Sequence, residues 1–327
     1  MKVLFQRPYF ARGLGWDGLA PLLPGWQIDW CEPDQTAEHL DGADVICPSG
    51  VPVDRGLIEA GRFGLVQQYG VGVELIDVDA ATEHGVWVAR IAADASGNAD
   101  SVAELAVLDL LALARDLDGM RATLRERRWA DRASGRSLFG GCVLIVGLGA
   151  IGTAVARRLG PFGARLLAIR AHPEHGGPAG IATVAGPDQL HELLGQADAV
   201  VCAAMFGPGT TRMFDASAFA AMKPGALFVN VARGGMVDED ALLAALESGQ
   251  VGGAGLDVFA DEPPPAGSPL LRHPRVIGTP HVGGLTGHMF YRSGELFAGN
   301  LRRWAAGEAP RWAVNAPPSL RGPGQAS

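Results

Sequence analysis

The segment Cys142-Val143-Leu144-Ile145-Val146-Gly147-Leu148-Gly149-Ala150-Ile151-Gly152 decides the fold. Its first five residues are apolar or uncharged, which is typical of a buried strand in a parallel sheet. Residues 153–159, which follow, are mostly good helix formers. A strand, a Gly-x-Gly-x-x-Gly turn and a helix in immediate succession predict a site that binds a dinucleotide.

Each glycine of this turn has its own task. Gly147 permits the tight turn, Gly149 lets the backbone approach a pyrophosphate, and Gly152 lets the helix pack closely on the strand. Ala150 and Ile151 are expected at the cofactor too, and the helix that follows offers free N–H groups and a positive dipole end that suit phosphates. A glycine-rich turn that binds nothing would show the same spacing, but a strand and a helix in register favour the binding site.

Length and composition limit the classes to which the chain can belong. Its 327 residues predict two domains, and 48% hydrophobic with 19% charged residues is typical of a globular protein. A net charge of −8 argues against nucleic acid or an anionic membrane as partner. The four cysteines, Cys31, Cys47, Cys142 and Cys202, form neither a CxxC motif nor a Cys/His cluster. We therefore expect reduced cysteines, no metal site, and a cytoplasmic protein without signal peptide or membrane span.

Strands and helices are expected to alternate along the first region of the chain. The strands are predicted at residues 2–6, 27–30, 43–47, 65–69 and 85–89, and the helices at 35–40, 54–60 and 79–83. A break is expected at residues 94–100, then a long apolar helix over 101–118 and a polar, Arg-rich surface arm over 121–138. This alternation predicts a parallel sheet.

The same alternation continues after the glycine turn. Further strands are predicted at residues 165–170, 199–203, 226–231, 253–259 and 276–278, with Asp188, Asp215 and Asp238 as helix N-caps. Residues 289–306 are predicted to form a final helix that returns to the first domain, and the tail after Pro317 is expected to fray. We therefore expect a Rossmann domain of residues 100–285, inserted into a smaller α/β domain of residues 1–99 and 286–327.

Three predicted strands are followed by residues that can carry chemistry, at the edge where open α/β sheets bind ligands. Arg233 can hold a carboxylate and the adjacent carbonyl oxygen in its planar fork. His281 can donate a proton to a new alkoxide, and Glu262 can orient the imidazole and keep it charged near neutral pH. With a hydride from the nicotinamide of the bound dinucleotide, this set suits the reduction of a 2-oxo acid.

Each of these residues also has a plain structural interpretation. Arg233 could pair with Asp238, and Glu262 could be a solvated loop acid. His281 could be a structural turn histidine, with His288 as the competing candidate. Structural ion pairs perturb charged groups as functional sites do, so only the combination with the glycine turn favours a catalytic set.

The combination of motifs resembles the D-isomer-specific 2-hydroxyacid dehydrogenases, and within them the glyoxylate and hydroxypyruvate reductases. The resemblance rests on five motifs in this order: Asn98-Ala99-Asp100-Ser101-Val102-Ala103-Glu104, Gly147-Leu148-Gly149-Ala150-Ile151-Gly152, Val229-Asn230-Val231-Ala232-Arg233-Gly234, Asp257-Val258-Phe259 with Glu262-Pro263, and Thr279-Pro280-His281. It implies a flavodoxin-like fold for the smaller, substrate-binding domain. It also implies a homodimer formed through the cofactor domain, with the helix near residues 101–118 at the interface.

The resemblance also assigns roles to residues. It implies that Arg233, Glu262 and His281 are catalytic and that Asp257 contacts the nicotinamide carboxamide. The backbone of Val71 and Gly72 would hold the substrate carboxylate, with Asn98 positioning that loop. The further residues expected at the cofactor are Ser101 and Ala232.

The chain departs from the pattern of the family at two places. Glu74 stands where the substrate loop usually has Asp or Asn, which puts the side-chain contacts of that loop in doubt but not its backbone role. Arg170 stands where an acid would accept from the ribose 2′-OH of NAD. An arginine pairs instead with a 2′-phosphate, and His172 could assist, so we expect NADP(H) to be favoured over NAD(H). A solvated arginine beside a tolerant pocket is the alternative.

We therefore expect an NADP(H)-dependent reductase of a small 2-oxo acid of the glyoxylate or hydroxypyruvate type. A corepressor-like protein that senses dinucleotides without turnover is the alternative of a different class. A phosphite dehydrogenase of the same fold also stays open, as does a phosphoglycerate dehydrogenase, although 327 residues leave no room for an added regulatory domain. A formate dehydrogenase fits less well because such enzymes generally have glutamine where Glu262 stands.

Overall fold

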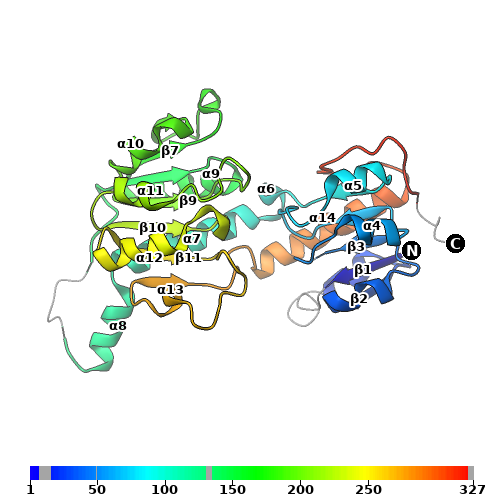
Figure 1. The fold of residues 1–327 in the computed structure, drawn as a ribbon, viewed down its shortest axis with the longest axis horizontal. Coiled ribbons are helices and arrows are strands. Elements are labelled where there is room, and N and C mark those ends of the chain that lie inside the picture. Colours follow the sequence, from blue (N-terminus) through cyan, green and yellow to red (C-terminus); the bar gives the residue numbers. More distant parts are fainter. Residues whose placement is uncertain (7–15, 49, 130–134, 323–327) are drawn as a thin grey trace. The chain divides into compact units, whose positions relative to one another are not determined.

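The computed structural model describes residues 1–6, 16–48, 50–129 and 135–322 (Figure 1). The chain divides into two compact units. Unit 1 comprises Met1–Gly97 with Thr286–Ser327, and unit 2 comprises Asn98–Leu285. The first crossing between units thus falls two residues before the position placed from the sequence, and the second falls at the same position. Unit 2 is inserted into unit 1.

The sheet of unit 1 has five parallel strands in the order β2-β1-β3-β4-β5. This is the flavodoxin-like order. The strands are β1 (Lys2–Gln6), β2 (Gln27–Cys31), β3 (Val45–Cys47), β4 (Leu65–Gln67) and β5 (Trp87–Ala89). The helices are α2 (Trp16–Leu19), α3 (Thr36–His39), α4 (Arg55–Ala60), α5 (Val78–Glu83), α6 (Ala93–Ser96) and α14 (Gly287–Ala305).

The last helix, α14, completes the core of unit 1. Phe297 is fully buried, with its ring 5.4 Å from that of Phe5 and 5.3 Å from that of Tyr69. The predicted return of the final helix to the first region is therefore confirmed. The predicted fraying after Pro317 is wrong for the described part of the tail, because the Arg321 guanidinium donates to the carbonyls of Ile58 and Gly61.

The sheet of unit 2 has seven parallel strands in the order β12-β11-β10-β9-β6-β7-β8. This is the dinucleotide-binding order of two βαβαβ halves with one more strand added at the edge. The strands are β6 (Cys142–Val146), β7 (Arg165–Ile169), β8 (Ile181–Ala185), β9 (Ala199–Cys202), β10 (Ala226–Asn230), β11 (Val251–Leu256) and β12 (Val276–Gly278). The predicted α/β architecture with an inserted Rossmann unit is confirmed.

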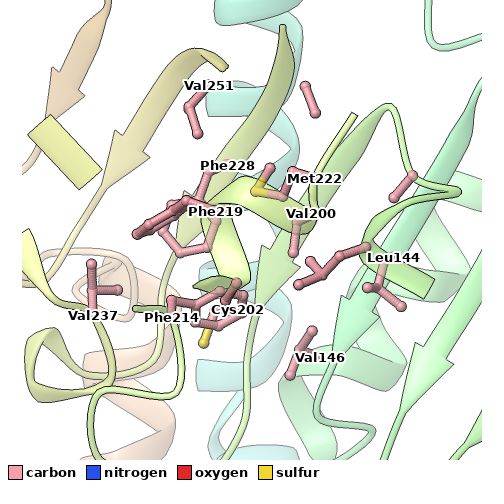
Figure 2. Close-up of a cluster of buried hydrophobic side chains, with 14 of the residues drawn as sticks. Leu144, Val146, Val200, Cys202, Phe214, Phe219, Met222, Phe228, Val237 and Val251 are labelled. Carbon is pink, nitrogen blue, oxygen red and sulfur yellow. The ribbon is translucent and has the colours of Figure 1, made fainter. Parts of the chain in front are cut away.

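The helices of unit 2 are α7 (Asn98–Ala114), α8 (Leu117–Arg125), α9 (Ala150–Leu159), α10 (Leu190–Leu194), α11 (Ala216–Ala221), α12 (Glu239–Ser248) and α13 (Pro269–Arg272). A cluster of buried side chains holds one layer of them to the sheet, and Figure 2 shows part of it. The ring of Phe228 on β10 makes edge contacts with those of Phe214 and Phe219, at 4.8 and 5.4 Å between centroids. This apolar layer fixes the strands whose ends carry the candidate site.

Several predicted boundaries are wrong for local reasons. The expected break at residues 94–100 is helical on both sides of Gly97, which has a left-handed backbone (φ 78°). The long helix ends at Ala114 rather than 118, because Asp116 (φ 50°) is the N-cap of α8 and accepts from the Gly119 N–H.

Asp188 lies inside a 3₁₀ turn and is not an N-cap, whereas Asp215 and Asp238 are. Strand β8 was not predicted. Of the expected arm, residues 130–134 lie outside the described part of the chain.

Candidate active site

The glycine turn between β6 and α9 leaves room for a phosphate group. Gly147 has a φ of 99°, which other residues rarely adopt, and a Cβ at Gly152 would overlap the Gly147 carbonyl. Gly149 is the N-cap of α9 and offers no side-chain cap, and a Cβ there would meet nothing within 4 Å. The first N–H groups of α9, including those of Ala150 and Ile151, have no intrahelical acceptor. These residues therefore fit the pyrophosphate of a dinucleotide.

Arg170 and His172 lie on the loop that follows β7, as predicted from the sequence. The Arg170 guanidinium donates to the Gly176 carbonyl at 2.5 Å, which leaves further donors on its fork. His172 Nδ1 lies 3.2 Å from a carboxylate oxygen of Glu174, and both side chains are exposed. The loop therefore presents a guanidinium, an imidazole and a carboxylate. The carboxylate, Glu174, was not considered in the interpretation of the sequence.

Arg233 lies three residues after Asn230, the last residue of β10, and hydrogen bonds hold this short segment in place. The side chain of Asn230, which is fully buried, accepts from the Ala232 N–H at 3.0 Å and donates to the Arg233 carbonyl at 3.0 Å. The Arg233 guanidinium donates to the Ala232 carbonyl at 2.7 Å. Asn230 is a positioning residue that was not assigned from the sequence. The sequence feature that could have identified Asn230 is a polar residue at the end of an otherwise apolar strand.

His281 and Glu262 form a pair, with Nδ1 of the histidine 2.8 Å from Oε2 of the carboxylate. His281 has a left-handed backbone (φ 53°), and its N–H donates to the Asp257 carbonyl. Burial acts to raise the pKa of Glu262, but the hydrogen bond and charge of His281 outweigh it and hold that pKa below its usual value. The charge of Arg233 acts in the same direction. The three predicted catalytic residues therefore interact within unit 2.

Asp257 anchors the segment of residues 279–283, which we call the His281 loop. Its Oδ1 accepts from the Thr279 hydroxyl at 2.6 Å and from the Val282 N–H at 2.9 Å. Its Oδ2 accepts from the Gly283 N–H at 2.8 Å. The carboxylate is 2% exposed and has about one acceptor position left, on Oδ2, for the nicotinamide contact implied by the family resemblance. Its evident structural task is to hold the His281 loop.

The remaining predicted residues are distributed over both units. Asn98 is the first residue of α7, and Ser101 and Ala232 are buried in unit 2. Val71 and Gly72 lie in unit 1, where the Gln68 side chain donates to the Gly72 carbonyl at 2.9 Å. Glu74, in the same loop, is exposed.

Among the described parts of the chain, no group of three or more His, Cys, Asp or Glu side chains is arranged to hold a metal ion. No helix in those parts has both the length and the apolar character needed to cross a membrane.

The strand order and the glycine turn are those of a Rossmann dinucleotide-binding unit, and comparison with known proteins gives the family. A family model described as "D-isomer specific 2-hydroxyacid dehydrogenase, NAD binding domain" matches residues 107–283. The chain belongs to the D-isomer-specific 2-hydroxyacid dehydrogenase family, as its motifs indicated.

Individual relatives agree with this assignment. D-3-phosphoglycerate dehydrogenase from Mycobacterium bovis is 38% identical over 293 residues, which are 88% of this chain and 54% of that protein. The chain thus spans about half the length of the curated relatives it matches. NAD-dependent formate dehydrogenase from Staphylococcus aureus, solved with NAD, has a TM-score of 0.83 and 27% identity, and the match covers 97% of this chain and all of that one. A D-isomer specific 2-hydroxyacid dehydrogenase from Xanthobacter autotrophicus Py2, solved with NADPH, has a TM-score of 0.76 and 28% identity, with 96% and 98% covered.

Proposed function

We propose that this protein is an NAD(P)-dependent oxidoreductase that interconverts a small 2-oxo acid and its D-2-hydroxy acid. The observation that carries the proposal is the His281–Glu262 pair at 2.8 Å with the charge of Arg233 acting on the same carboxylate. A corepressor-like binding protein would need the glycine turn but would have no use for this pair. The pair therefore favours turnover over sensing.

The three residues divide the reaction among them. Arg233 binds the substrate carboxylate and carbonyl oxygen, and it stabilises the charge that develops on that oxygen. Because Glu262 occupies Nδ1 of His281, Nε2 is the nitrogen left to donate a proton to the oxygen during reduction, or to accept it during oxidation. Glu262 orients the ring through its bond to Nδ1. The nicotinamide supplies the hydride when the dinucleotide is bound.

Unphosphorylated 2-oxo acids and phosphorylated compounds are the two candidate classes of substrate. Glyoxylate or hydroxypyruvate fits an arginine that binds one carboxylate and one carbonyl oxygen. D-3-Phosphoglycerate is the second candidate, because the relative from Mycobacterium bovis, 38% identical, is named for that activity. A phosphorylated substrate needs a further cationic group for its phosphate, in addition to the Arg233 guanidinium.

A substrate panel tests the proposed function. Purified protein is assayed with NADPH and NADH against glyoxylate, hydroxypyruvate, pyruvate and phosphohydroxypyruvate, and in the reverse direction with formate, phosphite and D-3-phosphoglycerate. We expect turnover with at least one unphosphorylated 2-oxo acid. Tight dinucleotide binding without turnover of any compound would contradict the enzyme and support a sensor. Turnover of phosphorylated compounds alone would select the second substrate class.

We further propose a preference for NADP(H), supported by Arg170 on the loop after β7. A charge-assisted hydrogen bond contributes about 1.5–3 kcal/mol, so Arg170→Asp is expected to lower the NADPH/NADH ratio of kcat/KM by about ten-fold to a hundred-fold. The matched control is Glu174→Gln, which removes the one carboxylate paired with His172. We expect this control to raise the same ratio or leave it unchanged. An unchanged ratio in Arg170→Asp, or a wild-type preference for NADH, would contradict the role of Arg170.

We also propose a cytoplasmic homodimer that assembles through unit 2. Apolar side chains on and after α8 support such a contact, since Leu124 is 61% and Trp129 83% exposed. Exposed large apolar residues that gather on one segment are typical of protein interfaces. Sedimentation at several protein concentrations, with Trp129→Ala beside the wild type, would test the dimer.

A further inference from the structure

Asp109 carries a buried carboxyl group that the proposed reaction does not use. The residue lies on α7 and is 2% exposed. Its Oδ2 has no hydrogen-bond partner among the residues that the structure describes. Burial of an ionised carboxylate without a partner is strongly unfavourable, so such a group either holds a proton or interacts with another charge.

Asp109 packs against strand β11 at Gly255, where the strand has no side chain. A Cβ at Gly255 would lie 2.7 Å from the Cβ of Asp109, so the aspartate occupies the space that a side chain at Gly255 would fill. Asp257 is the first residue after β11 and lies two residues beyond Gly255. Asp109 therefore packs beside the end of the strand that leads into Asp257.

A second contact places α7 against the His281 loop. A Cβ at Gly283 would lie 2.8 Å from Oδ2 of Asp257 and 3.2 Å from Cδ2 of Leu105. Leu105 precedes Asp109 by one turn of α7. The helix that carries Asp109 is thus packed against the same loop that Asp257 anchors.

Nearby charges do not neutralise Asp109. Burial, and then the negative charge of Asp257, raises the pKa of Asp109 to about 7. Strands β10 and β11 contain no charged residue, and Arg158 on α9 is bonded to Asp100 and Glu104 near the start of α7. The charged residues of α8, Asp118, Arg121 and Arg125, follow the end of α7 on an exposed helix. Asp257 is the charged group that acts on Asp109 most directly.

We propose that Asp109 is a positioning residue that keeps the His281 loop anchored through Asp257, and that it does so only while it carries a proton. With Asp109 neutral, Asp257 is the single negative charge in this part of the core and its carboxylate holds the three loop donors. When Asp109 ionises, two like charges share the same low-dielectric space and repel. The repulsion weakens the bonds from Thr279, Val282 and Gly283, and the His281 loop loosens. The consequence for turnover rests on the proposed function, whereas the consequence for the loop does not.

Hydrogen exchange measures the loop anchor directly. Protection of the Val282 and Gly283 N–H groups, corrected for intrinsic exchange, is compared between about pH 6 and pH 8 in the wild type and in Asp109→Asn. We expect wild-type protection to fall by about tenfold over this range, which equals one pKa unit of coupling between the two carboxyl groups. Asp109→Asn cannot ionise, and its protection should stay constant. The matched control Leu105→Ala loosens the same packing without a charge and should lower protection equally at both pH values.

The stability of the protein gives an independent readout with a defined sign. Because the pKa of Asp109 is higher in the folded chain than in the unfolded one, the folded state binds more protons, and its stability falls as pH rises from about 4 to about 7. The Tm advantage of Asp109→Asn over the wild type should grow across that range and stay constant above it. Asp109→Leu should show the same pH dependence around a different baseline, because it also cannot ionise.

These measurements separate the failure of this proposal from failure of the proposed function. If the protein turns over a 2-oxo acid, wild-type kcat should fall more steeply above about pH 7 than the kcat of Asp109→Asn, which keeps the proton donor but cannot ionise at position 109. Identical pH profiles of protection in the wild type and Asp109→Asn would overturn the positioning role, whether or not turnover is found. Loss of protection with pH in the wild type alone would uphold it even if every substrate fails.

Discussion

Replacing His281 with asparagine is expected to lower kcat/KM for the 2-oxo acid by about 10²–10⁴-fold, the usual contribution of a general acid. The change removes the nitrogen that donates the proton and leaves Glu262 without the partner that lies 2.8 Å away. Affinity for the dinucleotide should stay close to that of the wild type, because the glycine turn before α9 belongs to a different part of unit 2. Initial rates and fluorescence titration with NADPH measure the two effects separately.

The sequence itself supplies the control for this experiment. From the sequence, His288 was the alternative to His281 as proton donor. It lies exposed on α14, in unit 1. His288→Asn should retain most of the activity. Glu262→Gln should show a smaller loss than His281→Asn, since the imidazole persists but loses the charge that orients it. Full activity in His281→Asn, or a greater loss in His288→Asn, would show that the proton comes from another group.

Arg233→Ala is expected to have the second large effect, a loss of kcat/KM of about 10²–10³-fold, as when a donor to a developing oxyanion is removed. KM for the 2-oxo acid should rise as well, because the carboxylate loses its bidentate partner. Arg233→Lys should recover only part of the loss, since an ammonium group keeps the charge without the planar fork. Steady-state kinetics at saturating NADPH measures both parameters.

A matched arginine distinguishes this effect from a general loss of positive charge. Arg272 is at the end of α13, where its guanidinium contacts the Ala266 carbonyl at 3.4 Å. Arg272→Ala should leave kcat and KM unchanged. If Arg233→Ala lost dinucleotide affinity in parallel with activity, the arginine would hold the cofactor rather than the substrate, and its assignment would have to change.

The parts of the fold and site that the sequence predicted follow either from local patterns in the chain or from one rule of sheet topology. The strand, turn and helix around Gly147 need only neighbouring residues, so their pattern is readable directly. The predicted grouping of Arg233, Glu262 and His281 follows from one topological rule, that parallel strands end at the same edge of a sheet. Their interaction in the structure agrees with that expectation.

The features that were missed are one contact between residues distant in the sequence and two local turns of the backbone. Asp109 meets Asp257 only because helix α7 packs on strand β11 at Gly255, and no local pattern encodes that meeting. Glu174 was not considered because its pairing with His172 requires the loop after β7 to turn back on itself. The end of α7 was misplaced because apolar periodicity continues past Ala114, while the left-handed Asp116 stops the helix.

The insertion of unit 2 into unit 1 fixes an order of completion during synthesis. Unit 2 is one continuous segment, and all of its strands have been made once residue 285 has left the ribosome. Unit 1 has its five strands much earlier, yet Phe297, Leu301 and Trp304 of its core reside on α14, near the end of the chain. Nascent unit 1 therefore exposes an unfilled apolar sheet face throughout the translation of unit 2, and chaperone binding is to be expected there first.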